Sequence, residues 1–119
     1  CAGVGNLASI GQSPGNVAGL PVRAAYRRTL VDEILRVLGK RGQCLDLITS
    51  GKDRCDACLP DEPYFRRFRE LGGEIVTIGS DAHSADRVGQ YTPEACRLLK
   101  DIFGHVCTFE NRQVLFHAL

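Results

Sequence analysis

The stretch GEIVTIGSDAH, residues 73–83, decides both the fold class and the candidate chemistry of this chain. Residues 74–78, EIVTI, are rich in β-branched side chains and have a glycine on either flank, which is typical of a strand. Asp81 and His83 follow where this strand turns into a loop. In open α/β sheets and (β/α) barrels, functional groups gather at the carboxyl ends of parallel strands. The stretch therefore predicts an α/β fold with a polar site at this strand end.

Helical and strand patterns alternate on the N-terminal side of this stretch. Residues 2–7 are expected to end a strand, and residues 8–20, rich in Gly, Ser, Pro and Asn, to form a loop. Residues 22–41 are predicted to form a helix that ends at Gly42. A short apolar strand over residues 44–49 follows it. The apolar face of the helix is expected to comprise Tyr26, Leu30, Val31, Ile34, Leu35 and Leu38.

Two further helices flank the stretch. The first follows Asp61, a suitable N-cap residue, and ends at Gly72 and Gly73. The second is expected to have Thr92 as its cap and Pro93 at its first position, and to end before Gly104. Two short strands, residues 105–109 and 114–117, complete the chain. The alternation predicts an α/β fold with a largely parallel sheet and one domain, residues 1–119.

Composition excludes several classes of function. The 119 residues are 44% apolar, and 15 basic against 14 acidic residues leave a formal charge of +1. This balance gives no electrostatic basis for a nucleic-acid or membrane-surface partner. No run is long enough to span a membrane, and no signal peptide is visible. Six cysteines would allow a disulfide framework. However, Cys44 and Cys107 lie in apolar strand-like runs and Cys96 lies on the apolar side of a predicted helix, so we expect free, reduced thiols and a cytoplasmic protein.

Asp81 and His83 are the candidate metal ligands. A carboxylate and a neutral imidazole two residues apart at a strand end can converge on one divalent cation, and these donors suit Zn, Mn or Fe. The pattern is short, and a structural alternative remains open. In that alternative, Asp81 caps a following short helix and His83 bonds the backbone.

The same stretch, extended by residues 86–89, resembles the last metal motif of the PHP-domain histidinol phosphatases, a strand of the form ITLGSDAH. Residues 45–51, LDLITSG, are similar to the family's LEINTSG strand. The helix between them and residues 109–116, FENRQVLF, also follow the family's pattern. The resemblance therefore extends from about residue 44 to the end of the chain, in order and spacing.

This resemblance implies the C-terminal part of a distorted (β/α) barrel and a metal-dependent phosphoesterase that hydrolyses a small phosphomonoester. By resemblance, that substrate is histidinol phosphate, an intermediate of histidine biosynthesis. Asp81 and His83 carry over as metal ligands. Lys52 and Arg54 follow the LITSG segment and are candidates for contacting the substrate phosphate, with a solvated loop as the alternative. The implied cofactor is Zn, Mn or Fe, which lowers the pKa of bound water and holds the phosphate.

The departures from the family pattern weaken the implied metal site. The family's first metal motif, H-x-H, has no counterpart in this chain. Asn6 and Ala8 stand where the family commonly has the histidine and aspartate of GHLD, and Asp46 stands where it has a glutamate. We therefore expect an incomplete site and no catalysis by this chain alone. The alternative is a degenerate, non-catalytic PHP remnant that acts as a scaffold or interaction module.

Part of a barrel also leaves strand edges open, so we expect the chain to self-associate. The remaining motifs are interpreted structurally. The C-x-x-C pair at residues 55–58 has no second pair to complete a zinc site, and it precedes rather than opens a helix. Residues 11–15 lack the glycine spacing of a phosphate-binding loop. His105 and His117 are interpreted as surface or structural histidines. The arginines Arg66, Arg67 and Arg69 are expected to form the solvated face of a helix.

Overall fold

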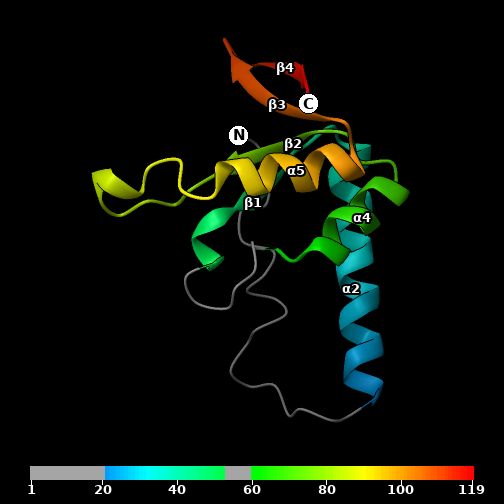
Figure 1. Cartoon of the computed structure of the whole chain (residues 1–119). Helices are drawn as coiled ribbons and strands as arrows, with labels where there is room; N and C mark the ends of the chain where they lie inside the picture. Colours follow the sequence, from blue (N-terminus) through cyan, green and yellow to red (C-terminus); the bar gives the residue numbers. More distant parts are fainter. Residues whose placement is uncertain (1–20, 53–59) are drawn as a thin grey trace.

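The computed structural model describes residues 21–52 and 60–119 (Figure 1). Asn6, Ala8, Arg54, the C-x-x-C pair and the other expectations for residues 2–20 and 53–59 lie outside the described residues. The elements, in chain order, are α2 (Pro21–Lys40), β1 (Leu45–Ile48), η1 (Thr49–Gly51), α4 (Glu62–Glu70), β2 (Val76–Gly79), η2 (Ala85–Arg87), α5 (Thr92–Ile102), β3 (His105–Glu110) and β4 (Gln113–Ala118). Within the described residues, the predicted helices and strands are present, with ends within about two residues of the expected ones.

The strands form two short sheets. β1 and β2 pair in parallel, from Leu45 opposite Val76 to Ile48 opposite Gly79. β3 and β4 pair in antiparallel. The α/β class is confirmed, and the parallel arrangement is confirmed for β1 and β2. The two C-terminal strands instead form a hairpin, because only two residues, Asn111 and Arg112, separate them and a parallel connection needs a much longer crossover.

The core lies between the helices and one face of the β1–β2 sheet. Leu45, Leu47 and Val76 are fully buried on this face and pack against side chains from α2, α4 and α5. The period of two along a strand sends Asp46 and Thr77 to the opposite face. One face of the sheet is therefore apolar and covered by helices, and the other carries polar groups. The core members from the helices and from the C-cap of α5 are Val31, Leu35, Leu38, Phe65, Phe68, Ala95, Leu99 and Phe103.

The apolar helix faces and the helix caps differ from the sequence prediction at two positions, Leu30 and Thr92. Leu30, predicted on the apolar face of α2, is 43% exposed, whereas Val31 is buried. Thr92 is not the cap of α5: Tyr91 precedes the helix in the left-handed conformation, and the Thr92 hydroxyl donates to the Gly89 carbonyl at 2.7 Å. Asp61 is the N-cap residue of α4, as predicted, but its side chain makes no capping hydrogen bond.

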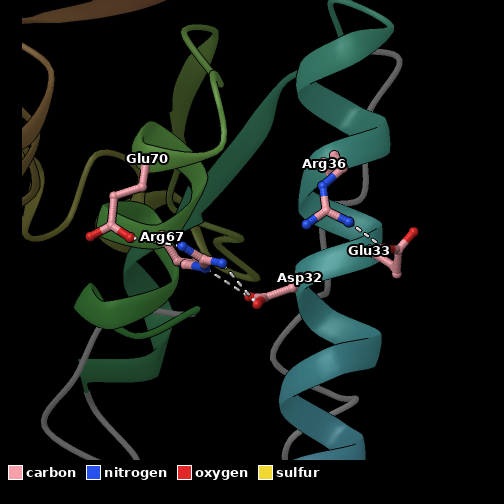
Figure 2. A network of polar contacts seen from close by, with 5 residues as sticks. All are labelled: Asp32, Glu33, Arg36, Arg67 and Glu70. Atoms are coloured by element: carbon pink, nitrogen blue, oxygen red, sulfur yellow. Dashed lines mark hydrogen bonds and ion pairs between the residues drawn. The ribbon is translucent and has the colours of Figure 1, made fainter.

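Ion pairs join α4 to its neighbouring helices (Figure 2). Arg67 donates to both carboxylate oxygens of Asp32 on α2, at 3.0 Å each, and to Glu70 at 2.9 Å. The hydrogen bond from Arg67 lowers the pKa of Asp32. Within α2, Arg36 also pairs with Glu33. Arg66 reaches Asp101 of α5 at 2.7 Å. The arginines of α4 therefore lie at the surface, as predicted, and two of them also form ion pairs with α2 and α5.

The cysteines divide into two groups. Cys107 is buried and free, as predicted, and burial raises its pKa. Cys96 is free and half-buried. Cys44 is buried as expected but takes part in a disulfide bond, so the prediction of a free thiol is wrong at this position. Among the described residues, no helix is both long and apolar enough to cross a membrane.

Candidate functional site

The carboxyl ends of β1 and β2 meet at one edge of the parallel sheet. Ile48 lies opposite Gly79 at the last position of both strands. The chain therefore leaves the two strands side by side, through η1 and Lys52 after β1 and through residues 80–83 after β2. Figure 1 shows η1 and the loop after β2 on the same side of the molecule. The two sequence segments that carry the candidate residues thus start from adjacent points.

Asp81 and His83 form a local turn just beyond β2. Asp81 adopts the left-handed conformation, with φ 49°, and both side chains are exposed. The His83 Nδ1 lies 2.8 Å from the Asp81 carbonyl oxygen. A carbonyl only accepts, so Nδ1 is the donor in this contact, and in the neutral imidazole Nε2 is then the nitrogen with a lone pair for another partner. The backbone bond expected in the structural alternative is therefore present, and it orients the imidazole.

The structural alternative also has Asp81 as the cap of the following short helix, and here the structure differs. Ser84, and not Asp81, is the N-cap residue of η2. The Ser84 hydroxyl hydrogen-bonds to Asp86 and lowers the pKa of that carboxyl group. The Asp81 carboxylate is therefore not used as the cap of η2.

Asp46 lies on the polar face of the sheet, one strand away. The Thr77 hydroxyl donates to the Asp46 Oδ1 at 2.6 Å, and both residues are half-buried. A Cβ built on Gly79 would lie 3.1 Å from the Asp46 Oδ2, which is closer than such contacts normally are. Glycine at position 79 therefore leaves room for the carboxylate as it leans toward the strand end. Thr77 and Gly79 were not predicted as site residues, because their contact with Asp46 depends on the register of two strands.

Thr49 and Lys52 follow β1. Thr49 is fully buried, and its Oγ1 has no hydrogen-bond partner among the residues described. An unpaired buried hydroxyl is uncommon, because its desolvation is not compensated. Lys52 is half-buried at the C-cap of η1. No contact places it beside Asp81 or His83, and Arg54 lies outside the described residues.

The donors of the turn fit a divalent transition metal in kind but not in number. Carboxylate and imidazole suit Zn, Mn or Fe, and the free Nε2 of His83 is an appropriate ligand atom. Within residues 21–52 and 60–119, no group of three or more His, Cys, Asp and Glu side chains is placed to share one metal. A complete metal site needs more ligands than this turn supplies.

The two remaining histidines have structural contacts. The His105 Nε2 lies 2.6 Å from the Glu74 carbonyl oxygen, and its ring packs edge-on against Phe103 and Phe116. The His117 Nε2 lies 2.7 Å from the Thr108 hydroxyl across the hairpin. Both observations agree with the structural interpretation of these residues.

The chain is similar to curated phosphatases. It is 37% identical over 73 residues to a probable histidinol-phosphatase of Thermotoga maritima, which covers 61% of this chain and 31% of that protein. A probable histidinol-phosphatase of Clostridium acetobutylicum is 30% identical over 82 residues, covering 69% of this chain and 32% of its own length. The histidinol-phosphatase of Lactococcus lactis is 28% identical over 94 residues, or 78% of this chain and 35% of its own.

The chain thus spans about a third of the length of the curated relatives it matches. No model of a protein family matches its sequence. The similarity is therefore to one part of each of these histidinol-phosphatases.

Proposed function

We propose that this chain carries the last metal motif of a PHP-type, metal-dependent phosphomonoesterase that acts on histidinol phosphate, and that it does not turn over substrate by itself. The observation that carries the proposal is the similarity to three histidinol-phosphatases over 61%, 69% and 78% of the chain. On this proposal, the β1–β2 sheet and its helices are part of a distorted (β/α) barrel, and the chain acts as one part of a larger active site.

The geometry of the strand ends supports the roles of Asp81 and His83. They follow β2 at the edge where β1 also ends, and the backbone bond to His83 leaves Nε2 free to bind a metal. A Zn, Mn or Fe ion held there would lower the pKa of a bound water and neutralise charge on the phosphate. Lys52 and Arg54 are proposed to contact that phosphate. Asp46 is proposed to lie near the site, in contact with Thr77.

Metal binding by the purified chain tests this proposal directly. The metal content of the chain is measured by plasma mass spectrometry after incubation with Zn, Mn or Fe and removal of the unbound ion. The double variant Asp81→Ala/His83→Ala is expected to retain less metal than the unchanged chain. The matched control is Asp61→Ala/His117→Ala, which removes an exposed carboxylate that makes no capping hydrogen bond and an exposed imidazole, both outside the turn. Equal metal retention by the unchanged chain and both double variants would contradict the roles of Asp81 and His83.

Catalysis is tested in a chimera. The chain replaces the corresponding third of the Thermotoga maritima relative, and phosphate release from histidinol phosphate is measured with each metal. We expect release by the chimera, none by the chain alone, and a large loss in the chimera with Asp81→Ala/His83→Ala. A folded chimera that binds metal but releases no phosphate would instead favour the alternative, a non-catalytic scaffold or interaction module. The substitutions of Asn6 and Ala8 for the family's histidine and aspartate motivate that alternative.

A further inference from the structure

β4 is an open strand edge on the outside of the molecule. Within the described part of the chain, it pairs with β3 alone. Five of its six residues are exposed, and Val114 is half-buried. Figure 1 shows the β3–β4 hairpin at the periphery, away from α2 and α4. Its outer side therefore presents backbone donors and acceptors for which β3 provides no partner.

The turn of the hairpin determines which backbone groups these are. Asn111 and Arg112 have φ values of 51° and 65°, which is typical of the two-residue type I′ turn. In such a hairpin the closing pair, Glu110 and Gln113, exchanges hydrogen bonds, and the pattern alternates along the strands. The N–H and C=O groups of Val114, Phe116 and Ala118 consequently point outward.

The edge lacks the features that normally prevent strand addition. β4 contains no Lys, Arg, Asp, Glu or Pro, although edge strands commonly carry such residues to block pairing. Its apolar side chains are also accessible: Phe116 is 52% exposed and Leu115 is 39% exposed. An accessible six-residue edge without these residues favours pairing with another strand.

We propose that β4 pairs with β4 of a second copy of this chain, antiparallel and about a two-fold axis at Phe116. In this register Phe116 lies opposite Phe116 of the second copy, and Val114 lies opposite Ala118 in both directions. All three outward-pointing residues then pair, and the two hairpins form one four-stranded sheet. An isologous contact of this kind closes on itself and yields a dimer.

Charge and size favour a second copy as the partner. β4 has no Lys, Arg, Asp or Glu, and in this register His117 lies opposite Leu115 of the second copy, so antiparallel self-pairing brings no like charges into direct opposition. The larger Val114 meets the small Ala118, so only the two Phe116 rings must share space at the axis. Phe116 is already held from one side by the edge-on His105 ring, at 5.1 Å between centroids. This proposal does not depend on the proposed enzymatic function.

The test is the association state of the full chain, measured by sedimentation velocity over a wide range of concentrations. We expect a reversible monomer–dimer equilibrium. In the dimer, amide hydrogen exchange slows at Val114, Phe116 and Ala118 as concentration rises, whereas the Leu115 amide, bonded to β3, is protected throughout. A monomer at every concentration overturns the proposal, as does a dimer in which these three amides exchange as fast as in the monomer.

Two matched variants locate the axis. Phe116→Lys places two like charges opposite each other and is expected to weaken dimerisation by about tenfold or more. Phe109→Lys introduces the same charge on β3, away from the β4 edge, at a phenylalanine that is 42% exposed. This variant is expected to change dimerisation little. An equal mixture of Phe116→Lys and Phe116→Glu is expected to dimerise again. Equal weakening by the two lysine variants, or no recovery in the mixture, overturns the proposed register.

A backbone variant tests the same pairing in case the lysine variants do not fold. Ala118→Pro removes one outward-pointing N–H but no bond to β3, since proline is tolerated at an edge position that faces solvent. Circular dichroism confirms that the variant is folded. Its dimer is expected to be weaker than that of the unchanged chain, and a folded variant that dimerises equally well overturns the proposal.

Discussion

Replacement of Gly73 by alanine tests the packing that positions β2 and, with it, the candidate site. Gly73 lies between α4 and β2, and it is buried. A Cβ at this position would lie 2.4 Å from Cζ of Phe68 and 2.5 Å from two further ring atoms. The Phe68 ring is fully buried and packs against Phe103, with centroids 6.4 Å apart, so it has little room to withdraw.

The expected cost follows from this overlap. Overpacking of a core typically costs about 1 to 3 kcal/mol, and contacts this short place Gly73→Ala near 3 kcal/mol. The reduced entropy of the unfolded chain offsets about 0.4 to 1 kcal/mol of this, which leaves a net loss of about 2 kcal/mol or more. Urea unfolding followed by circular dichroism measures the difference in the free energy of unfolding.

Two comparisons separate the steric cause from other effects. A Cβ at Gly72 would have no atom within 4 Å, but the backbone there has φ 93°. Gly72→Ala should therefore lower the free energy of unfolding by about 1 to 2 kcal/mol through backbone strain alone. Phe68→Leu makes room beside position 73, so the double variant with Gly73→Ala should lose at least about 1 kcal/mol less than the sum of the single losses. Additive losses in the double variant, or a Gly73→Ala protein as stable as the original, would refute the reasoning.

Two further substitutions probe single polar groups. Thr49→Val removes a buried hydroxyl that has no hydrogen-bond partner in the described residues. The free energy of unfolding, measured in urea, is therefore expected to stay equal or to rise by about 1 kcal/mol. A clear loss of stability would mean that the hydroxyl has a partner. Arg67 lowers the pKa of Asp32 below its ordinary value of 3.8. The ionised carboxylate therefore stabilises the fold at pH values above 3.8. This contribution is lost as the pH falls through the lowered pKa. The stability lost in Asp32→Asn should therefore shrink from about pH 7 to about pH 3, and a loss that is independent of pH would contradict this.

Local patterns in the sequence predicted most of the elements. The β-branched residues of 74–78 predicted β2, and the helical spacing of Phe65 and Phe68 predicted α4. These patterns are reliable because side chains repeat every two residues in a strand and every 3.6 in a helix, whatever the partner is. The position of Asp81 and His83 just beyond a strand end followed from the same local information.

The prediction failed where the outcome depended on neighbours distant in sequence. Leu30 shares the spacing of the apolar stripe of α2 but is exposed, because the other core elements cover only the part of the helix face that includes Val31 and Leu35. The conformation of Tyr91 places the start of α5 at Thr92, so the Thr92 hydroxyl bonds Gly89 instead of capping the helix. Neither outcome is encoded in residue spacing alone.

The sequence by itself determined the α/β class, the elements and the strand-end motif of Asp81 and His83. Only the tertiary structure decided which groups surround that strand end. The contact of Asp46 with Thr77 joins residues 31 positions apart, and the pair from Arg67 to Asp32 joins residues 35 apart. Such contacts depend on strand register and helix packing, which are set by the burial of the whole core. Short-range periodicity carries no information about them, and for that reason they appear only in the folded chain.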